Sequence, residues 1–513
     1  MAVADTGWGM LVARNAQEAA DLTAIARRVA EECETPFFVP QDGFLTTHTL
    51  ETLRRPEDEL LRRFVGDPRA RLRDLLSPAE GLMSGVVENQ DAYMKGRIGQ
   101  RAFYERIPGR LAAAFDEWAA LTGRRYGAIA THCSADAEQV VVSMGTMADT
   151  AEAVVDRLRE GGRKVGSVTV TAFRPFPAAE LADALRNASV VAVIERTDEP
   201  AAADNPLTRE LKAALADLAA DGATIPRVIS ASAGLGSRDV AAGDIAAVFD
   251  WAADPRAVHE RHYAVLGVRH PLALERVALD VTPPNAYRLR GHSIGGFGSV
   301  TTNKVLATLV GEVFGLQVQA YPRYGSEKKG LPTTYYLTIA DARIRQHAEI
   351  QAVDFVALHD VAAFRQGNVL GGLVDDGAVF VQTSLTAPTE IWAAIPAEAR
   401  DALVRRRIHV WALDTARLAR HHAPRPELEV RMQGVALAGV FLRVAPFAAR
   451  AGKDVEALMR AVRRQLERFF GKRGAAVVEA NLAVVREAYG AVIDVTAALA
   501  AATQEADLLE VAR

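Results

Sequence analysis

The sequence has few cysteines, and they are not arranged as a metal site. Its 513 residues contain only Cys33 and Cys133, which lie far apart and form no Cys-x-x-Cys pair. A structural zinc site built on cysteines and a four-cysteine iron–sulfur cluster are therefore excluded within this chain. No metal site is predicted. So few thiols are more typical of a reducing cytoplasm than of a secreted, disulfide-bonded protein.

The sequence also lacks charge of one dominant sign and long apolar runs. The formal net charge is only -4, so neither nucleic acid nor an acidic membrane surface is expected as a partner. No apolar run approaches the roughly 18 residues needed to cross a bilayer. The first residues lack the basic start and apolar core of a signal peptide. With 50% apolar and 24% charged residues, the composition predicts a soluble, cytoplasmic, globular protein.

Neither the dinucleotide fingerprint G-x-G-x-x-G nor a P-loop is present, but one stretch is rich in glycine. Gly291–Lys304 follows a strand-like segment, Ala286–Arg290, and precedes an apolar helical pattern, Val305–Phe314. In a strand, turn and helix in this order, backbone N–H groups and the helix dipole face an anion at the turn. Two readings remain open from the residues alone: a phosphate site, or a tight strand-to-helix turn.

A second glycine-containing loop, Tyr321–Gly330, carries the paired lysines Lys328 and Lys329. Two such turns in one small domain suit a phosphate-bearing ligand. The blander alternatives are a surface or capping role for His292 and a solvated loop for the lysines. Arg290 and Lys304 add positive charge, and no catalytic residue is assigned. The candidate binding residues are Gly291, His292, Gly295, Gly296, Gly298, Thr301, Thr302, Lys304, Ser326, Lys328 and Lys329.

The periodicity predicts an α/β fold with mostly parallel sheets in three-layer domains. Ala16–Glu32 has the apolar spacing of a helix. From Tyr126 onward, strands and helices alternate regularly. The predicted elements of this middle part are strands at Gln139–Met144, Val165–Val170 and Ser189–Ile194, and helices at Asp149–Glu160 and Ala178–Leu185.

The last part of the chain is again predicted to be α/β. Its predicted strands are Gln317–Tyr321, Thr333–Ile339, Phe355–Leu358, Ala378–Val381 and His409–Ala412. Its predicted helices are Glu390–Arg407, Glu427–Val444, Val455–Phe470 and Val477–Leu509. The segment between Asp254 and Pro284 has no regular hydrophobic period, which predicts a linker. Together these patterns predict domains at 1–121, 122–255 and 286–513, with a linker at 256–285.

Three groups of residues resemble the 2-oxoacid:ferredoxin oxidoreductases of the pyruvate:ferredoxin oxidoreductase type. Asp5–Met10, Asn15–Ala19 and Gln41–His48 resemble the end of the first alpha domain. Three further segments resemble the second alpha domain, which is similar to a transketolase C-terminal domain. They are Val141–Thr146, Phe173–Pro177 and Glu195–Pro200. Gly295–Gly298 and Gly325–Gly330 resemble the gamma domain. These groups span nearly the whole chain in the family's order.

The resemblance implies a subunit of an enzyme that decarboxylates a 2-oxoacid, pyruvate or 2-oxoglutarate, and passes electrons to ferredoxin, or runs the reverse carboxylation. It implies residues 1–121 as an incomplete thiamine-pyrimidine-type domain with connector helices, then the transketolase C-terminal-like domain, then a gamma-type domain associated with coenzyme A (CoA). Thiamine diphosphate, magnesium and iron–sulfur clusters are then expected in partner chains. Expected partners are a beta-type subunit that binds thiamine diphosphate, a ferredoxin or ferredoxin-like subunit, and a chain completing the first domain unless the sequence starts late at Met1.

Other readings stay open at this point. The chain is alternatively a non-catalytic assembly subunit or paralogue in such a complex, or an unrelated CoA- or nucleotide-binding protein. Asp42 and His48 border a substrate cavity or, as the simpler expectation, cap a local turn and pack, respectively. Glu195–Thr197 ends a parallel strand, where open α/β sheets bind ligands, although an interface role is equally compatible. His421 and His422 are interpreted as structural.

Overall fold

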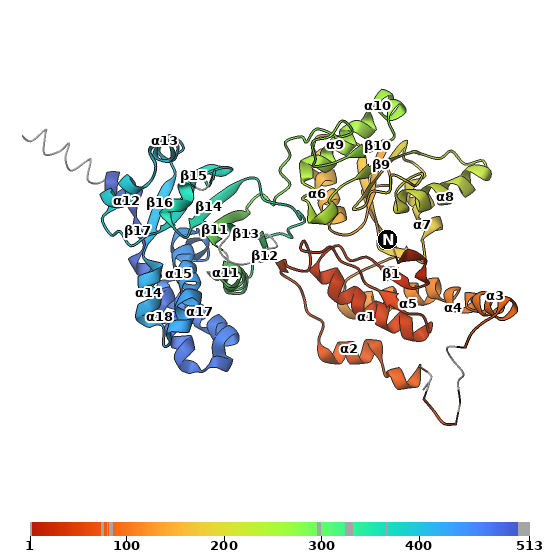
Figure 1. The fold of residues 1–513 in the computed structure, drawn as a ribbon, viewed down its shortest axis with the longest axis horizontal. Helices are drawn as coiled ribbons and strands as arrows, with labels where there is room; N and C mark the ends of the chain where they lie inside the picture. Colours follow the sequence, from red (N-terminus) through yellow and green to blue (C-terminus); the bar gives the residue numbers. More distant parts are fainter. Residues whose placement is uncertain are drawn as a thin grey trace, which may run out of the picture. The chain divides into compact units, whose positions relative to one another are not determined.

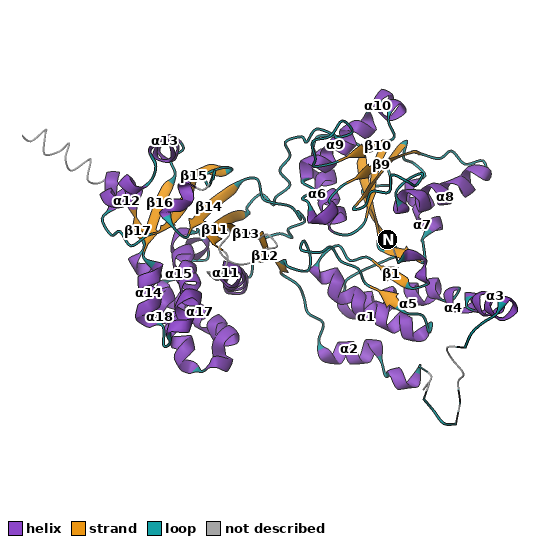
Figure 2. Cartoon of the chain, in the orientation of Figure 1, coloured by secondary structure: helices purple, strands orange, loops and turns teal. Residues whose placement is uncertain are grey.

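The computed structural model describes residues 3–72, 76–79, 81, 86–294, 299–323, 332–365 and 367–500. The chain divides into two compact units, which are described separately. Unit 1 contains residues 1–47, 53–281 and 345–348, and unit 2 contains residues 48–52, 282–344 and 349–513. The predicted α/β class is confirmed, and Figure 2 shows strands flanked by helices in each unit. Among the helices of these described ranges, none has the length and apolar character of a membrane span.

Unit 1 begins with a small helical layer on a three-stranded sheet. The sheet has the order β2–β1–β7, where β1 is Gly9–Leu11, β2 is Phe37–Phe38 and β7 is Ala172–Arg174. Helix α1 (Ala16–Glu32) matches the predicted helix residue for residue, and its cap Asn15 accepts a hydrogen bond from the Glu18 N–H. It packs on α5 (Ile107–Thr122) around the fully buried Trp118. The other helices here are α2 (Asp58–Val65), α3 (Gln90–Gly99) and α4 (Arg101–Tyr104).

The larger sheet of unit 1 has the order β10–β9–β8–β5–β6–β4 and is parallel except for its edge strand β4. The strands are β4 (Ile129–His132), β5 (Gln139–Ser143), β6 (Val165–Val170), β8 (Val190–Glu195), β9 (Arg227–Ser232) and β10 (Tyr263–Val265). The helices are α6 (Thr146–Glu160), α7 (Ala178–Leu185), α8 (Pro206–Ala220), α9 (Ala242–Ala253) and α10 (Pro255–Glu260).

Alternate residues of β5 explain why both faces of this sheet are covered. Val141 packs with α6 and α9, whereas Val140 and Val142 pack with α7 and α8. Figure 1 shows these two pairs of helices on opposite sides of the strands. Because β5 is buried on both faces, its sequence is a continuous apolar run, as predicted. One expectation differs from the structure: α10 and β10 lie where an irregular linker was predicted, because the three-residue strand β10 is too short to show a period.

Unit 2 contains one eight-stranded sheet of order β17–β16–β15–β14–β11–β13–β12–β3. Its central strands β16, β15, β14 and β11 are mutually parallel, and the flanking strands are antiparallel. The strands are β3 (Leu50–Glu51), β11 (Tyr287–Ile294), β12 (Gln317–Arg323), β13 (Pro332–Ala340), β14 (Val353–Leu358), β15 (Leu373–Gln382), β16 (His409–Leu413) and β17 (Ile493–Asp494).

Two helical layers enclose this sheet. One face packs on α11 (Ser299–Phe314), α14 (Thr415–His422), α15 (Glu429–Val444), α17 (Val455–Phe470) and α18 (Ala475–Ala491), with α16 (Phe447–Arg450) beside them. The opposite face packs on α12 (Pro388–Ala394) and α13 (Ala397–Arg405). Two predicted helices are corrected. Glu390–Arg407 is broken at Ile395 and Pro396, since proline disrupts a helix interior. Val477–Leu509 is interrupted after Ala491 by the short strand β17, beyond which residues 495–500 are helical again.

Candidate functional site

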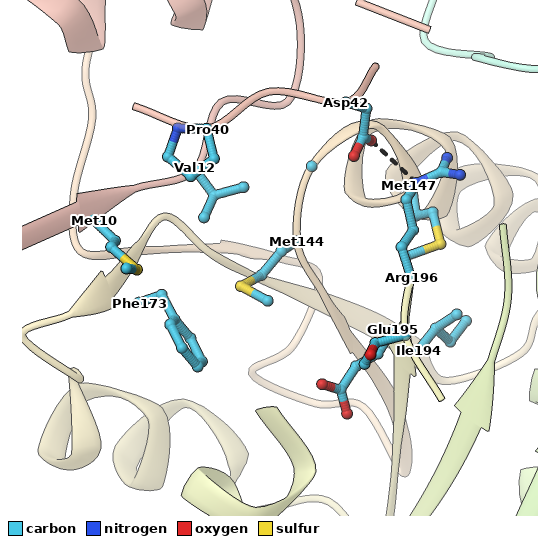
Figure 3. Close-up of a pocket in the computed structure, with 12 residues that line it drawn as sticks. Met10, Val12, Pro40, Asp42, Met144, Met147, Phe173, Ile194, Glu195 and Arg196 are labelled. Atoms are coloured by element: carbon cyan, nitrogen blue, oxygen red, sulfur yellow. Dashed lines mark hydrogen bonds and ion pairs between the residues drawn. The ribbon is translucent and has the colours of Figure 1, made fainter. Parts of the chain in front are cut away.

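A small cavity in unit 1 lies between the three-stranded sheet and the carboxyl ends of β5 and β8. Its volume is about 150 Å³. Figure 3 shows Met10 and Phe173 on one side and Met144 and Arg196 on another, with Asp42 at the top. The lining residues are Met10, Val12, Pro40, Asp42, Met144, Gly145, Met147, Phe173, Ile194, Glu195, Arg196 and Thr197. Ligands of open α/β sheets bind at this end of the strands.

Asp42 carries the negative charge at the rim of this cavity. Its Oδ2 accepts hydrogen bonds from the Thr146 N–H (2.8 Å) and from the Thr146 hydroxyl, and it forms an ion pair with Arg196 Nε at 3.2 Å. Thr146 is the first residue of α6, where the helix dipole stabilises a carboxylate. The simpler expectation was that Asp42 caps its local turn. Its carboxylate instead caps the start of α6 and pairs with Arg196, so that expectation is wrong.

Gly145 allows this contact between Asp42 and the helix. Its φ is +65°, and a Cβ atom on it would lie 2.8 Å from Asp42 Oδ2. Only glycine tolerates both the positive φ and the close approach. Arg196 is fixed further by donating to the Gly234 carbonyl (3.0 Å) and to the Thr146 hydroxyl (3.0 Å). Asp42 and Arg196 thus neutralise each other, so the cavity suits a small apolar group better than an ion.

Glu195 also lies at the end of β8, but its carboxylate is directed to α8. It accepts hydrogen bonds from the Leu207 N–H (2.6 Å), the Thr208 N–H (3.1 Å) and the Thr208 hydroxyl (2.8 Å). Burial raises the pKa of Glu195, and these hydrogen bonds oppose that rise. Glu195 therefore anchors the start of α8. All three members of the predicted triplet Glu195–Thr197 line the cavity, and Arg196 pairs with Asp42 at its rim.

The predicted phosphate cradle of unit 2 has different bounds from those expected. Strand β11 continues to Ile294, so Gly291 and His292 belong to the strand instead of to a turn. Helix α11 begins at Ser299, which places Thr301, Thr302 and the exposed Lys304 within its first turns. Gly295, Gly296, Gly298, Ser326, Lys328 and Lys329 lie outside the described residues. The order of strand, connection and helix is as predicted.

Gly291 is required by the packing of the sheet. A Cβ atom at this position would lie 1.9 Å from the ring of Tyr335, its neighbour on β13. Tyr335 is fully buried, and its hydroxyl lies 3.5 Å from His359 Nε2. The glycine that suggested a turn is therefore the residue that admits an aromatic ring across the strand pair.

Arg290 and His292 are two residues apart on β11 and thus point to the same face of the sheet. Arg290 Nη2 donates to the carbonyls of Val369 (2.8 Å) and Gly371 (2.6 Å). Arg290 Nε and His292 Nε2 are buried and have no hydrogen-bond partner within the described part of the chain. Burial lowers the pKa of Arg290 and lowers that of His292 to about 4, so His292 is neutral at pH 7. These two nitrogens suit a ligand oxygen as hydrogen-bond acceptor.

Three buried carboxylates of α1 form ion pairs with arginines. Glu18 is paired with Arg14, Asp21 with Arg124, and Glu31 with Arg27. The second carboxylate oxygen of Glu31, Oε2, is buried and has no hydrogen-bond partner within the described residues. A carboxylate that activates an aminopyrimidine needs a free oxygen directed at that ring, and Glu18 and Asp21 are instead held by their arginines.

Two other histidines named in the sequence analysis, His48 and His422, lie elsewhere in unit 2. His422 Nε2 lies 2.6 Å from Glu487 Oε2, which agrees with a structural role. His48 belongs to a short segment of unit 2 next to β3. Tyr335 on β13 and His359, which directly follows β14, could not be found from the sequence, because an isolated tyrosine or histidine beside an apolar run gives no motif.

Three family models match consecutive parts of the chain. Residues 1–116 match the thiamine diphosphate-binding domain of pyruvate flavodoxin/ferredoxin oxidoreductases, and residues 137–245 match core domain II of pyruvate:ferredoxin oxidoreductases. Residues 288–491 match the model described as pyruvate ferredoxin/flavodoxin oxidoreductase. The chain is thus built from domains of the 2-oxoacid:ferredoxin oxidoreductase class.

The curated proteins most similar in sequence include pyruvate oxidoreductases of this class. A pyruvate-flavodoxin oxidoreductase from Klebsiella pneumoniae is 30% identical over 94% of this chain and 40% of its own length. A pyruvate:ferredoxin oxidoreductase from Moorella thermoacetica is 28% identical over 96% of this chain and 41% of its own length. This similarity along almost the whole chain confirms the resemblance to the pyruvate:ferredoxin oxidoreductases that was stated from the sequence. The chain spans about two fifths of the length of these relatives.

A solved structure, the pyruvate oxidoreductase subunit PORC from Thermotoga maritima, covers 40% of this chain and 97% of its own length. It is 21% identical to this chain, with a TM-score of 0.31.

Proposed function

We propose that this chain supplies the alpha-type and gamma-type domains of an enzyme that oxidatively decarboxylates a 2-oxoacid in a CoA-dependent reaction. Its substrate is pyruvate or 2-oxoglutarate, with electrons passing to ferredoxin or flavodoxin, and the reverse carboxylation uses the same site. The observation that carries the proposal is the succession of three family matches, in one order, along residues 1–116, 137–245 and 288–491.

The proposal divides the work between this chain and its partners. Thiamine diphosphate, magnesium and iron–sulfur clusters are assigned to a beta-type partner and a ferredoxin-like partner, as the resemblance to the family implies. The boundaries 1–121, 122–255 and 286–513 are proposed for the three domains.

Unit 2 is proposed to bind CoA at the carboxyl end of β11. When bound, CoA supplies the thiol that accepts the acyl group. Arg290 Nε and His292 Nε2 are the buried polar atoms there that lack partners within the described residues, and both point to one face of the sheet. They are proposed to donate hydrogen bonds to ligand oxygens, while Lys304 on α11 adds an exposed positive charge. The glycines, hydroxyls and lysines predicted from the sequence are proposed as further contacts.

Calorimetric titration of the full chain with CoA tests this assignment. The expected result is saturable heat release, at least tenfold weaker binding by His292→Ala, and protection of residues 291–304 from hydrogen exchange. His422→Gln is a matched control, because His422 pairs with Glu487 and should leave CoA binding unchanged. Absence of both heat and protection in the wild-type chain would overturn the CoA assignment.

Lys328→Ala/Lys329→Ala tests the second predicted loop. If these side chains contact phosphate, the double variant weakens binding of CoA more than binding of pantetheine, which has no diphosphate group. Equal weakening of both ligands would contradict phosphate contact. A complex that binds CoA but shows no 2-oxoacid oxidation with all partners present would instead support the non-catalytic assembly role.

A further inference from the structure

A histidine, a cysteine and an aspartate meet in unit 1, and none of the three lines the cavity of that unit. His132 is the last residue of β4, Cys133 follows it in a turn, and Asp156 lies on α6. One imidazole nitrogen, the Cys133 Sγ and one Asp156 carboxylate oxygen all lie within 4.8 Å of one another. Three different metal-ligating groups therefore converge from a strand end, a turn and a helix.

The backbone of the turn is anchored so that these groups stay together. The Cys133 carbonyl accepts a hydrogen bond from Arg159 Nη2 at 2.7 Å. Gly166 on β6 packs closely beneath the turn, because a Cβ atom there would lie 2.7 Å from the Cys133 oxygen. Cys133 itself is exposed, so its side chain can change rotamer and remains accessible to an ion from solvent.

Asp156 is oriented from both sides. Its Oδ1 lies 2.6 Å from His132 Nε2, and its Oδ2 accepts a hydrogen bond from Arg345. Arg345 belongs to the segment 345–348 of the same unit. Carboxylates that bind metals are commonly fixed in this way by a second hydrogen-bonding group. Glu152 lies 3.9 Å from Arg345 and offsets part of its positive charge.

We propose that His132, Cys133 and Asp156 bind a zinc-like divalent cation, with water as the fourth ligand. Nitrogen, sulfur and oxygen donors together suit Zn²⁺ or Co²⁺, whereas Ca²⁺ and Mg²⁺ prefer oxygen donors alone. Binding releases the Cys133 thiol proton to solvent, and the metal takes the place of the hydrogen bond between His132 and Asp156. Bond lengths of about 2.0–2.3 Å require the three donor atoms to close around the ion, which rotation of the exposed Cys133 side chain allows.

Titration of the full-length, metal-free chain with Co²⁺ tests the proposal directly. The expected spectrum contains a thiolate-to-cobalt band in the near ultraviolet and tetrahedral bands in the visible, saturating at one ion per chain. Cys133→Ser should abolish the thiolate band. Cys33→Ser is the matched control, because Cys33 is the other thiol and is buried in a separate core, and it should leave the band unchanged. No thiolate band in the wild type, or a band that persists in Cys133→Ser, would overturn the proposal.

A thiol-labelling experiment identifies the other two ligands. Zn²⁺ should slow the reaction of Cys133 with a disulfide reagent at least tenfold in the wild type. The Zn²⁺ concentration needed should rise at least tenfold in His132→Gln and in Asp156→Asn. Glu160→Gln, an exposed carboxylate on the same helix paired with Arg157, is the control and should behave as wild type. Equal protection in all four proteins would overturn the assignment of His132 and Asp156, and the melting temperature of each metal-free variant verifies that it is folded.

Discussion

At the scale of single residues, the close packing of Gly291 against Tyr335 predicts that a side chain at position 291 lowers the stability of unit 2. Gly291→Ala should destabilise unit 2 by about 1–3 kcal/mol, because the added methyl overlaps the ring of the fully buried Tyr335. Chemical denaturation monitored by circular dichroism measures this loss.

Gly490→Ala is the matched control for Gly291→Ala. A Cβ atom at Gly490 in α18 meets nothing within 4 Å. Alanine is the better helix former by about 0.5–1 kcal/mol, so the control should be neutral or slightly stabilising. Equal effects of the two substitutions would show that Tyr335 does not constrain β11.

Two buried histidines of unit 2 predict a dependence of stability on pH. Burial lowers the pKa of His292 and of His359 from 6.5 to about 4. Between pH 4 and pH 6.5 the unfolded chain binds more protons than the folded chain. The contribution of these histidines to the free energy of unfolding is therefore fully present above pH 6.5 and is lost as the pH falls toward 4. At about 1.4 kcal/mol for each unit of pKa shift, the combined loss amounts to a few kcal/mol.

Urea denaturation at a series of pH values measures this effect. His292→Gln and His359→Gln should each make the decline of the free energy of unfolding between pH 6.5 and 4 less steep. A decline that is equally steep in wild type and in both variants would contradict the assignment to these two groups.

At the scale of elements, Asp21 joins α1 to the segment that follows α5. Its fully buried carboxylate accepts hydrogen bonds from Arg124 Nη2 (3.0 Å) and from the Tyr126 hydroxyl (2.7 Å). Asp21→Ala leaves a partly buried guanidinium and a phenol without their acceptor. It should destabilise unit 1 by about 2–4 kcal/mol.

Asp58→Ala provides the comparison for Asp21→Ala. Asp58 forms an exposed pair with Arg55, and such pairs contribute about 0–1 kcal/mol. Thermal unfolding of both variants should therefore show a large shift for Asp21→Ala and a small one for Asp58→Ala. Similar small shifts would indicate that Asp21 is not needed to dock α1.

The elements with a long, regular period were predictable from the sequence. Helices α1 and α17 begin and end where their spacing predicts, and in both an Asn or Asp cap accepts a hydrogen bond from the first turn. The end of β11 was not predictable, because glycine is a general signal for a turn and its need here arises from Tyr335, a residue on another strand. For the same reason, the contact of Asp42 with Thr146 could not be derived from local sequence.

At the scale of the whole molecule, the candidate sites were only partly predictable. The motif around Glu195–Thr197 correctly indicated the carboxyl end of a parallel strand, where the cavity lies. It could not distinguish Glu195, which caps α8, from Arg196, which pairs with Asp42. The metal-ligating group at His132, Cys133 and Asp156 was not predicted, since Asp156 comes from a separate helix and no regular ligand spacing marks it.

The role proposed for this chain is to act, together with partner chains, within a CoA-dependent 2-oxoacid oxidoreductase. Its most direct test is the activity of the complex purified natively through a tag on this chain. The measurement is the reduction of a low-potential viologen dye with pyruvate or 2-oxoglutarate, in the presence and absence of CoA. We expect reduction that depends on both the 2-oxoacid and CoA, with one acyl-CoA formed for every two electrons transferred. A complex containing thiamine diphosphate and iron–sulfur chains that reduces no dye with either 2-oxoacid would contradict the account.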